Sequence, residues 1–269
     1  MIIESVDNGF LNVCREDGIA TVTVNRPESR NAMTPAMWRD MAPVMESLGK
    51  ENEVRVIVLR GEGSGFVSGA DIREFEGIAG NLDAARDHVR CVEGAMEAIS
   101  EVRQPVIAMV NGHAIGGGCE LAMACDLRYA IRGAKFGIPA CRLGVVISFQ
   151  NTQRLMQLVG PACAQEMLMT GNVIEADEAG RIGLVNGVFP AEALEEPVYG
   201  VARNMCRLAP LTIQVAKVHI RRALLGPPLS SPKEGTAFSI NAYLSKDFKE
   251  GYTAFLEKRM PNFKGESVK

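Results

Sequence analysis

Hydrophobic and polar positions follow strand periodicity and helix periodicity in turn along the first half of the chain. Strands are predicted at three runs rich in β-branched and aliphatic residues: 19–24, 54–59 and 106–110. The first run ends at Pro27, which cannot donate a ladder hydrogen bond. The other two runs each lead into a glycine-rich loop.

Apolar residues three and four apart predict a helix after each of the first two strands. Thr34 is a candidate N-cap for the first helix, which Pro43 is expected to kink or shorten. The second helix is predicted from about residue 82 to 99, with apolar residues on one stripe: Leu82, Ala85, Val89, Val92, Met96 and Ile99. Strand, glycine-rich loop and helix recur about every 40 to 50 residues, which predicts an α/β fold of stacked ββα-type turns.

The pattern becomes helical from about Met205 onward. One helix is predicted before the break at Gly226-Pro227-Pro228, and a last helix is predicted through Tyr252. We therefore place a boundary near residue 200. It divides a core of residues 1–200, which holds the candidate site, from a C-terminal helical region of residues 201–269.

Composition points to a globular protein that handles small molecules. The chain has 269 residues, of which 47% are hydrophobic and 23% charged, enough to bury a sizeable core. Its net charge of -3 provides no cationic field of the kind that nucleic-acid or anionic-membrane binders use. The chain shows neither a signal peptide nor about 18 uninterrupted apolar residues, so we expect a cytoplasmic, soluble protein with no nucleic-acid or membrane partner.

Cysteine and histidine usage predicts neither disulfides nor a metal site. The seven cysteines are odd in number, scattered and mostly flanked by apolar residues, which is typical of small buried thiols in a reducing compartment. No spacing resembles paired zinc ligands, and the three histidines are far apart in the sequence.

Glu120 is the first candidate for chemistry, because it follows three consecutive glycines in the first turn of an otherwise apolar predicted helix. A carboxyl group in dry surroundings near a helix N-terminus can serve as a general acid or base. The alternative is a carboxylate that only caps its own helix.

Gly116, Gly117 and Gly118 leave backbone N–H groups bare at a strand-to-helix junction. Their spacing matches neither common phosphate-binding motif. An oxyanion hole remains, worth about 3 to 4 kcal/mol per donor, as does a glycine turn that binds nothing. A second donor is available from the small-residue stretch at 66–72.

The chain resembles the crotonase (enoyl-CoA hydratase/isomerase) superfamily over nearly its whole length. Several motifs occur in the family's order. They are Asn25-Arg26-Pro27 with Asn31-Ala32-Met33, Ser68-Gly69-Ala70-Asp71-Ile72, Pro105 to Gly112, Gly116 to Asp126, Lys135-Phe136-Gly137, Thr152-Gln153-Arg154-Leu155, Gly183 to Asn186, and Phe255 to Arg259 with Pro261-Asn262-Phe263.

The resemblance implies a crotonase-like spiral of ββα turns whose C-terminal helical region forms a homotrimer, usually paired as a dimer of trimers. It implies an acyl-CoA thioester as substrate, with coenzyme A as part of that substrate and no separate cofactor. The thioester oxygen would lie between the backbone N–H groups of Ala70 and Gly117. Residues near the substrate or its CoA would be Ser68, Gly69, Asp71, Ile72, Gly116, Ala140 and, on this or a neighbouring subunit, Lys258; a solvated charge is the alternative for Lys258.

The sequence departs from the family at its second catalytic carboxylate. Family hydratases have a glutamate after the proline of the segment that here contains Pro139-Ala140. The family's glycine-rich stretch before Thr152 is also replaced, here by Ser148-Phe149-Gln150-Asn151. Only Glu120 of the usual pair therefore remains.

Three reactions are compatible with a single glutamate. A lyase could hydrate an enoyl-CoA with Glu120 helped by Gln150 or Asn151, and an isomerase could shift one proton with Glu120 alone. A decarboxylase of a substituted malonyl-CoA, such as methylmalonyl-CoA, needs no base. We expect an enoyl-CoA hydratase/isomerase-type enzyme with Glu120 as its acid/base. A non-catalytic or RNA-binding homologue is a further alternative, against which the negative net charge argues.

Overall fold

The main feature of the computed structural model, which describes residues 2–6, 9–225 and 245–264, is a seven-stranded sheet. Its strands run β1-β2-β3-β4-β5-β7-β10. Their bounds are Ile2–Val6 (β1), Leu11–Glu16 (β2), Ile19–Val24 (β3), Val56–Gly61 (β4), Val106–Val110 (β5), Leu127–Ile131 (β7) and Gly187–Phe189 (β10). The first three strands pair antiparallel, and β3 through β10 pair parallel. The strands predicted at 19–24 and 106–110 are confirmed, and the one predicted at 54–59 begins later, at Val56.

A smaller sheet lies beside the first one. Its three strands, in the order β6-β8-β9, are Ala114–Ile115 (β6), Lys135–Gly137 (β8) and Ile174–Glu175 (β9). The residues between β5 and β6 and between β6 and α4 are the glycine-rich turns that the sequence predicted, so this small sheet holds the start of α4 in place.

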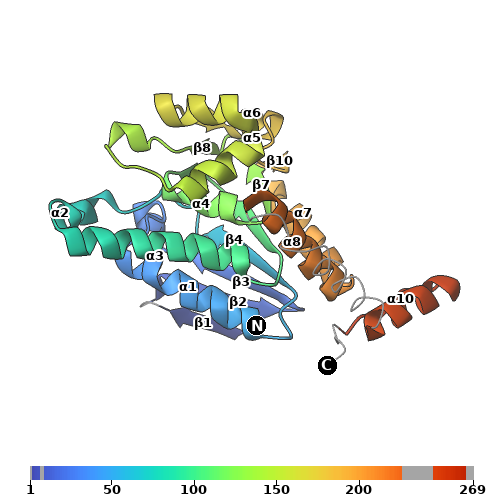
Figure 1. Ribbon diagram of the computed structural model, residues 1–269. Coiled ribbons are helices and arrows are strands. Elements are labelled where there is room, and N and C mark those ends of the chain that lie inside the picture. The colour runs from blue at the N-terminus through green and yellow to red at the C-terminus, as the bar shows by residue number, and fades with distance from the viewer. Residues whose placement is uncertain (1, 7–8, 226–244, 265–269) are drawn as a thin grey trace.

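Helices cover the main sheet (Figure 1). The α-helices are Pro35–Lys50 (α1), Phe75–Ile78 (α2), Leu82–Glu101 (α3), Gly117–Ala124 (α4), Phe149–Thr170 (α5), Ala176–Arg181 (α6), Glu195–Cys206 (α7), Pro210–Leu225 (α8) and Lys246–Leu256 (α10). Short 3-10 helices occur at Pro27–Ser29 (η2), Ile72–Glu74 (η3), Ala140–Arg142 (η4) and Ala191–Ala193 (η5). This arrangement is the α/β fold with a helical C-terminal region that the sequence predicted.

The parallel strands are apolar on both faces because each face packs against helices. In β4, Ile57 and Leu59 join the core cluster that includes α1 and α3, whereas Val56 and Val58 join the cluster that includes α7. Successive side chains of a strand point to opposite faces, so burial on both sides needs a continuous apolar run. That requirement explains why 54–59 and 106–110 show little alternation.

Helix α1 begins as predicted but is longer than Pro43 suggested. The hydroxyl of Thr34 accepts a hydrogen bond from the N–H of Met37 at 3.2 Å, which caps the helix. The prediction that Pro43 shortens the helix is wrong, because α1 continues to Lys50. Pro43 lies on the exposed side of α1, where water can satisfy the carbonyl that loses its N–H partner.

The C-terminal region is joined to the core through α8. The ammonium of Lys217 lies 2.8 Å from the Asp126 carboxylate, and the Lys217 side chain is 7% exposed. Helix α10 lies apart from the main sheet (Figure 1). The boundary near residue 200 falls within α7 and, like the trimerisation of this region, stays a prediction. The break at 226–228 lies outside the described residues.

The cysteines of the described residues form no disulfide bonds. All seven cysteines are free thiols. Cys119 is buried, and burial raises its pKa to about 12. Cys141 is exposed, so the cysteines are not all buried as predicted.

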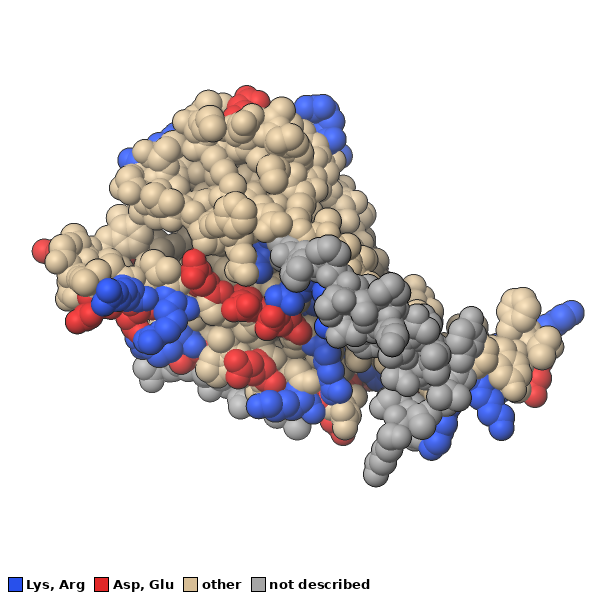
Figure 2. All heavy atoms as spheres, viewed as in Figure 1, with Lys and Arg blue, Asp and Glu red and all other residues tan. Residues whose placement is uncertain are grey.

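Across residues 2–6, 9–225 and 245–264, no helix combines the length and apolarity needed to cross a membrane. Figure 2 shows positive and negative side chains interspersed on one face instead of separated into patches of one sign.

Candidate active site

A cavity of about 250 Å³ lies among α3, α4, the loop before η3, and the segment from η4 to the start of α5. Most of its lining is apolar. The lining side chains and backbone include Trp38, Ile72, Phe75, Val89, Val92, Ile115, Ile138, Leu143, Val145, Val146 and Ile147, with polar groups from His88, Glu93, Glu120, Ser148 and Asn151. A small apolar cavity with few polar groups is the usual form of a small-molecule site.

Glu120 is brought to this cavity by the close approach of α4 to Val67, in the segment between β4 and η3. A Cβ atom on Gly118 would lie 1.8 Å from the carbonyl oxygen of Val67, so only glycine permits this packing. Glu120 then falls in the first turns of α4, with 8% of its surface exposed. Its burial raises the pKa of the carboxyl above its ordinary value, and the hydrogen bond from Asn151 opposes that rise.

A chain of buried side chains holds one oxygen of Glu120. The amide nitrogen of Asn151 donates a hydrogen bond to Glu120 Oε2 at 2.5 Å. Arg154 Nη1 donates to Asn151 Oδ1 at 2.7 Å, and Arg154 Nη2 donates to Ser100 Oγ at 3.0 Å. The hydroxyl of Ser148 accepts from the N–H of Asn151 and so caps α5. The start of α5 therefore fixes Asn151 and the orientation of the Glu120 carboxyl.

Two backbone amides from distant parts of the sequence lie close together beside Glu120. A Cβ atom built on Gly117 would lie 3.9 Å from the Ala70 nitrogen, and one on Gly69 would lie 3.5 Å from the Gly117 nitrogen. Among the described residues, the N–H groups of Ala70 and Gly117 donate no hydrogen bond to a backbone carbonyl outside a helix or strand. Gly69 has φ of +102°, which favours glycine and turns the chain at this point.

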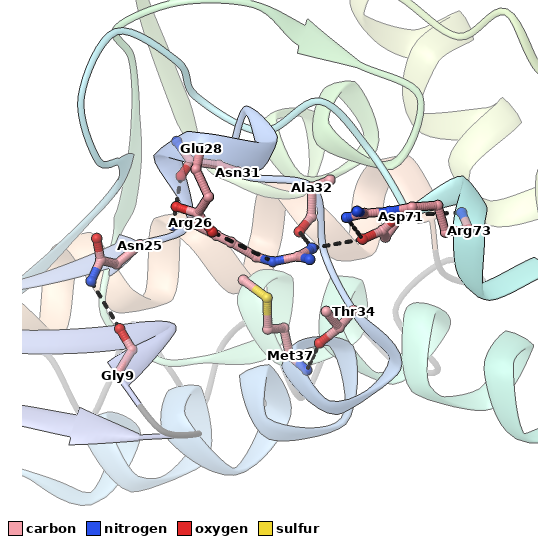
Figure 3. Close-up of polar contacts among 10 residues, drawn as sticks. All are labelled: Gly9, Asn25, Arg26, Glu28, Asn31, Ala32, Thr34, Met37, Asp71 and Arg73. Atoms are coloured by element: carbon pink, nitrogen blue, oxygen red, sulfur yellow. Dashed lines mark hydrogen bonds and ion pairs between the residues drawn. The ribbon is translucent and has the colours of Figure 1, made fainter.

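Asp71 does not line the cavity, although it directly follows Ala70. It accepts hydrogen bonds from Arg26 Nη1 at 2.8 Å and from Arg73 Nε at 2.9 Å (Figure 3). These two guanidinium groups hold the pKa of the Asp71 carboxyl far below its usual range, with Arg73 having the larger effect. Asp71 also caps η3 by accepting from the N–H of Arg73 at 3.2 Å. Its contacts in this structure are with the protein's own arginines.

Most of the residues predicted from sequence come together in the structure. Eight of them line the cavity: Ser68, Gly69, Ala70, Ile72, Gly116, Gly117, Glu120 and Ala140. Asp71 lies behind the cavity lining, and Lys258 follows the end of α10, away from this cavity, with φ of +55°. The predicted contacts of these residues with a substrate or with CoA stay predictions.

The lining residues outside the predicted set include Trp38, His88, Glu93 and Asn151, of which the sequence suggested only Asn151, as one of two possible helpers of Glu120. Asn151 had a recognisable signal, since it follows the N-cap Ser148 by three positions and precedes Arg154 by three, which is helical spacing. The other three lie on α1 and α3, and their sequence pattern gives no sign of which helix turn meets the cavity.

Comparison with known proteins identifies the family to which the chain is similar. The profile of the enoyl-CoA hydratase/isomerase family matches residues 14–266. A crotonyl-CoA hydratase from Syntrophomonas wolfei is 38% identical over 253 residues, covering 93% of this chain and 95% of the relative. A 2,3-dehydroadipyl-CoA hydratase from Escherichia coli is 34% identical over 258 residues, covering 95% of this chain and 98% of the relative.

A solved structure extends the likeness to the fold. The crystal structure of an enoyl-CoA hydratase/carnithine racemase from Magnetospirillum magneticum superposes with a TM-score of 0.91 at 36% identity, covering 97% of each chain. The resemblance that the sequence motifs indicated is thereby confirmed, as is the crotonase-like fold. The chain belongs to the enoyl-CoA hydratase/isomerase family.

Proposed function

We propose that this protein is an enoyl-CoA hydratase, a lyase that adds water across the 2,3 double bond of an acyl-CoA thioester. One observation supports this most: the buried Glu120 carboxyl shares a cavity with the unpaired amides of Ala70 and Gly117. Relatives that cover nearly the whole chain are named as hydratases, which favours hydration over isomerisation or decarboxylation.

The two amides would act on the thioester carbonyl. Their N–H groups would donate to the carbonyl oxygen, and the donation would strengthen as negative charge develops there during addition. Each such donor contributes about 3 to 4 kcal/mol when the charge forms away from water. Withdrawal of electrons toward this oxygen makes the β-carbon electrophilic, so it can form a bond to the oxygen of a water molecule.

Glu120 would supply the proton that the α-carbon gains. A buried carboxyl with a raised pKa retains its proton closer to neutral pH than an exposed one does. Asn151 occupies Oε2, which leaves Oε1 to face the substrate. Because Asn151 makes this contact and the exposed Gln150 does not line the cavity, we assign the supporting role to Asn151.

The lining indicates a short, uncharged acyl group. No lysine or arginine is among the lining residues, whereas two glutamates are, Glu93 and Glu120. A substrate with a second carboxylate at the end of its acyl chain would meet like charge without a compensating cation. The same repulsion opposes a malonyl-type thioester, so decarboxylation is disfavoured.

A panel of acyl-CoA thioesters tests the proposal, with products identified by mass spectrometry. We expect water addition to crotonyl-CoA, with kcat/KM at least about tenfold above that for 2,3-dehydroadipyl-CoA because of the missing cation. Release of CO2 from methylmalonyl-CoA without hydration of crotonyl-CoA would establish the decarboxylase instead. Salt-dependent RNA binding that is unchanged in Glu120→Ala, without turnover of any thioester, would establish a binding protein.

A further inference from the structure

The cavity lacks a carboxylate at the position where related hydratases have their second one. Ala140 begins η4 and lines the cavity, so this part of the wall has only a methyl group. Hydration needs one group that accepts a proton from water and another that gives a proton to the α-carbon. Asn151 cannot accept a proton at neutral pH, so a second acid/base has to come from elsewhere in the lining.

Helix α3 presents such a group. Four of its residues line the cavity, His88, Val89, Val92 and Glu93, and their spacing places them on one face of the helix. Glu97, one turn further along α3, does not line this cavity. The cavity therefore has a carboxylate on α3 as well as the one on α4.

Glu93 lies in surroundings that differ from those of Glu120. It is exposed, in contrast to the buried Glu120. Among the hydrogen bonds and ion pairs of the described residues, none involves Glu93, whereas Asp87 on the same helix pairs with Arg39 and Arg90. A carboxylate that lines a cavity without a guanidinium partner has its oxygens available for water.

The two carboxyl groups also interact electrostatically. The charge of Glu93 contributes to the raised pKa of Glu120, after the larger effect of burial. Two carboxyl groups in one site whose environments differ in this way divide naturally into an acid and a base. Burial favours the protonated form of Glu120, as an acid requires.

We propose that Glu93 is the second acid/base of the hydratase, an inference that rests on the function proposed above. The Glu93 carboxylate removes a proton from the attacking water as the water oxygen forms its bond to the β-carbon. The π electrons of the double bond move toward the thioester carbonyl and then return to form the bond between the α-carbon and the proton of Glu120. Water and enoyl thioester become the 3-hydroxyacyl thioester, and the proton on Glu93 returns through solvent to Glu120.

The test compares Glu93→Gln with Glu97→Gln, a matched change one turn away that leaves the cavity lining intact. We expect Glu93→Gln to lower kcat/KM for crotonyl-CoA by about 10²-fold or more, as for loss of a positioned base. Glu97→Gln should stay within about twofold of the wild type. Exposure of both side chains on α3 means that neither change disturbs the core.

Two further measurements separate a chemical role from a structural one. Exchange of the α-protons of butyryl-CoA with D₂O depends on Glu120, so Glu93→Gln should retain it while losing hydration. The double variant Glu93→Gln with Ala140→Glu should regain hydration, because it returns a carboxylate to the wall of the same cavity.

Three results distinguish failure of the role proposed for Glu93 from failure of the proposed hydratase function. Hydration by Glu93→Gln within about twofold of the Glu97→Gln control would overturn the inference while leaving the hydratase intact. Loss of both hydration and α-proton exchange in Glu93→Gln would overturn it too, since the change would then act on the whole site. Failure of the wild-type protein to hydrate any enoyl thioester would overturn the proposed function itself.

Discussion

Glu120 and Asp71 are both nearly buried carboxyl residues next to the proposed amide pair, yet their surroundings give them opposite properties. Asp71, 5% exposed, accepts hydrogen bonds from two guanidinium groups, and its pKa is lowered (Figure 3). Glu120, 8% exposed, accepts from the neutral amide of Asn151, and its pKa is raised. Burial outweighs the neutral hydrogen bond at Glu120, whereas the two guanidinium groups outweigh burial at Asp71.

This contrast shows how one small region combines structural and reactive carboxyl groups. The ion pairs of Asp71 fix the turn that presents the Ala70 amide, because Asp71 is the next residue in the chain. Among the described residues no cation is bonded directly to Glu120, and burial raises its pKa above the ordinary value. The buried Arg154 is hydrogen-bonded to Asn151 and not to Glu120, although its charge also lowers the pKa of Glu120.

The largest effect should come from Glu120→Gln, which keeps the shape of the side chain and removes the acid. We expect kcat/KM for crotonyl-CoA to fall by about 10² to 10⁴-fold. The free energy of unfolding should change by less than about 1 kcal/mol, since the charge lost is not part of an ion pair. Steady-state kinetics and urea unfolding check the two parts. Retained hydration would contradict the assigned role of Glu120.

Asp71→Asn should act on stability instead. It leaves the partly buried guanidinium of Arg26 without its carboxylate, and we expect a loss of about 3 kcal/mol in the free energy of unfolding. Because folding lowers the pKa of Asp71, its contribution is complete above about pH 5 and is lost as the pH falls below about 4. Urea unfolding of the wild type and Asp71→Asn from pH 7 down to pH 3 should show their difference shrinking; a constant difference would contradict this explanation.

Asn151→Ala tests the hydrogen-bond partner of Glu120. Loss of the hydrogen bond to Oε2 should lower the maximal rate about tenfold through poorer orientation. It should also raise the pKa of Glu120, so the decline of activity at high pH moves to higher pH. The pH dependence of kcat measures both effects. Gln150→Ala, beside it on the exposed side, serves as the control and should change neither.

The smallest effect should come from Arg73→Ala. Arg73 also bonds Asp71, but its side chain is 73% exposed, so water replaces much of what is lost. We expect less than about 1 kcal/mol in the free energy of unfolding. A loss equal to that of Asp71→Asn would show that exposure does not distinguish the two arginines.

The sequence predicted the strands and the glycine-rich turns well because close backbone packing allows few residue types. Gly118 and the apolar run Val106–Val110 show requirements that can be recognised without a structure. Pro43 was misjudged because only the structure shows which side of α1 it occupies. Glycine and proline thus signal local geometry better than they signal exposure.

The candidate site was predicted less completely than the fold. Residues in its loops, such as Ala70 and Gly117, were recognised by motif, and the structure brings them together. Glu93 was not, because one glutamate among several on a charged helix differs from Glu97 only in its position along the helix axis relative to the cavity. Asp71 shows the converse, as it lies within a recognised motif yet contacts arginines of the protein itself.

The tight seating of Gly118 against Val67 links two chemical functions in a single rigid turn. Gly117 and Glu120 flank Gly118 on α4, so any side chain at 118 would shift the amide donor and the proton donor together. The packing of Gly118 therefore fixes the spacing between the Gly117 amide and the Glu120 carboxyl. Variation in substrate preference has to arise in the opposite walls of the cavity, on α3 and the segment around Val145, which can change without altering that spacing.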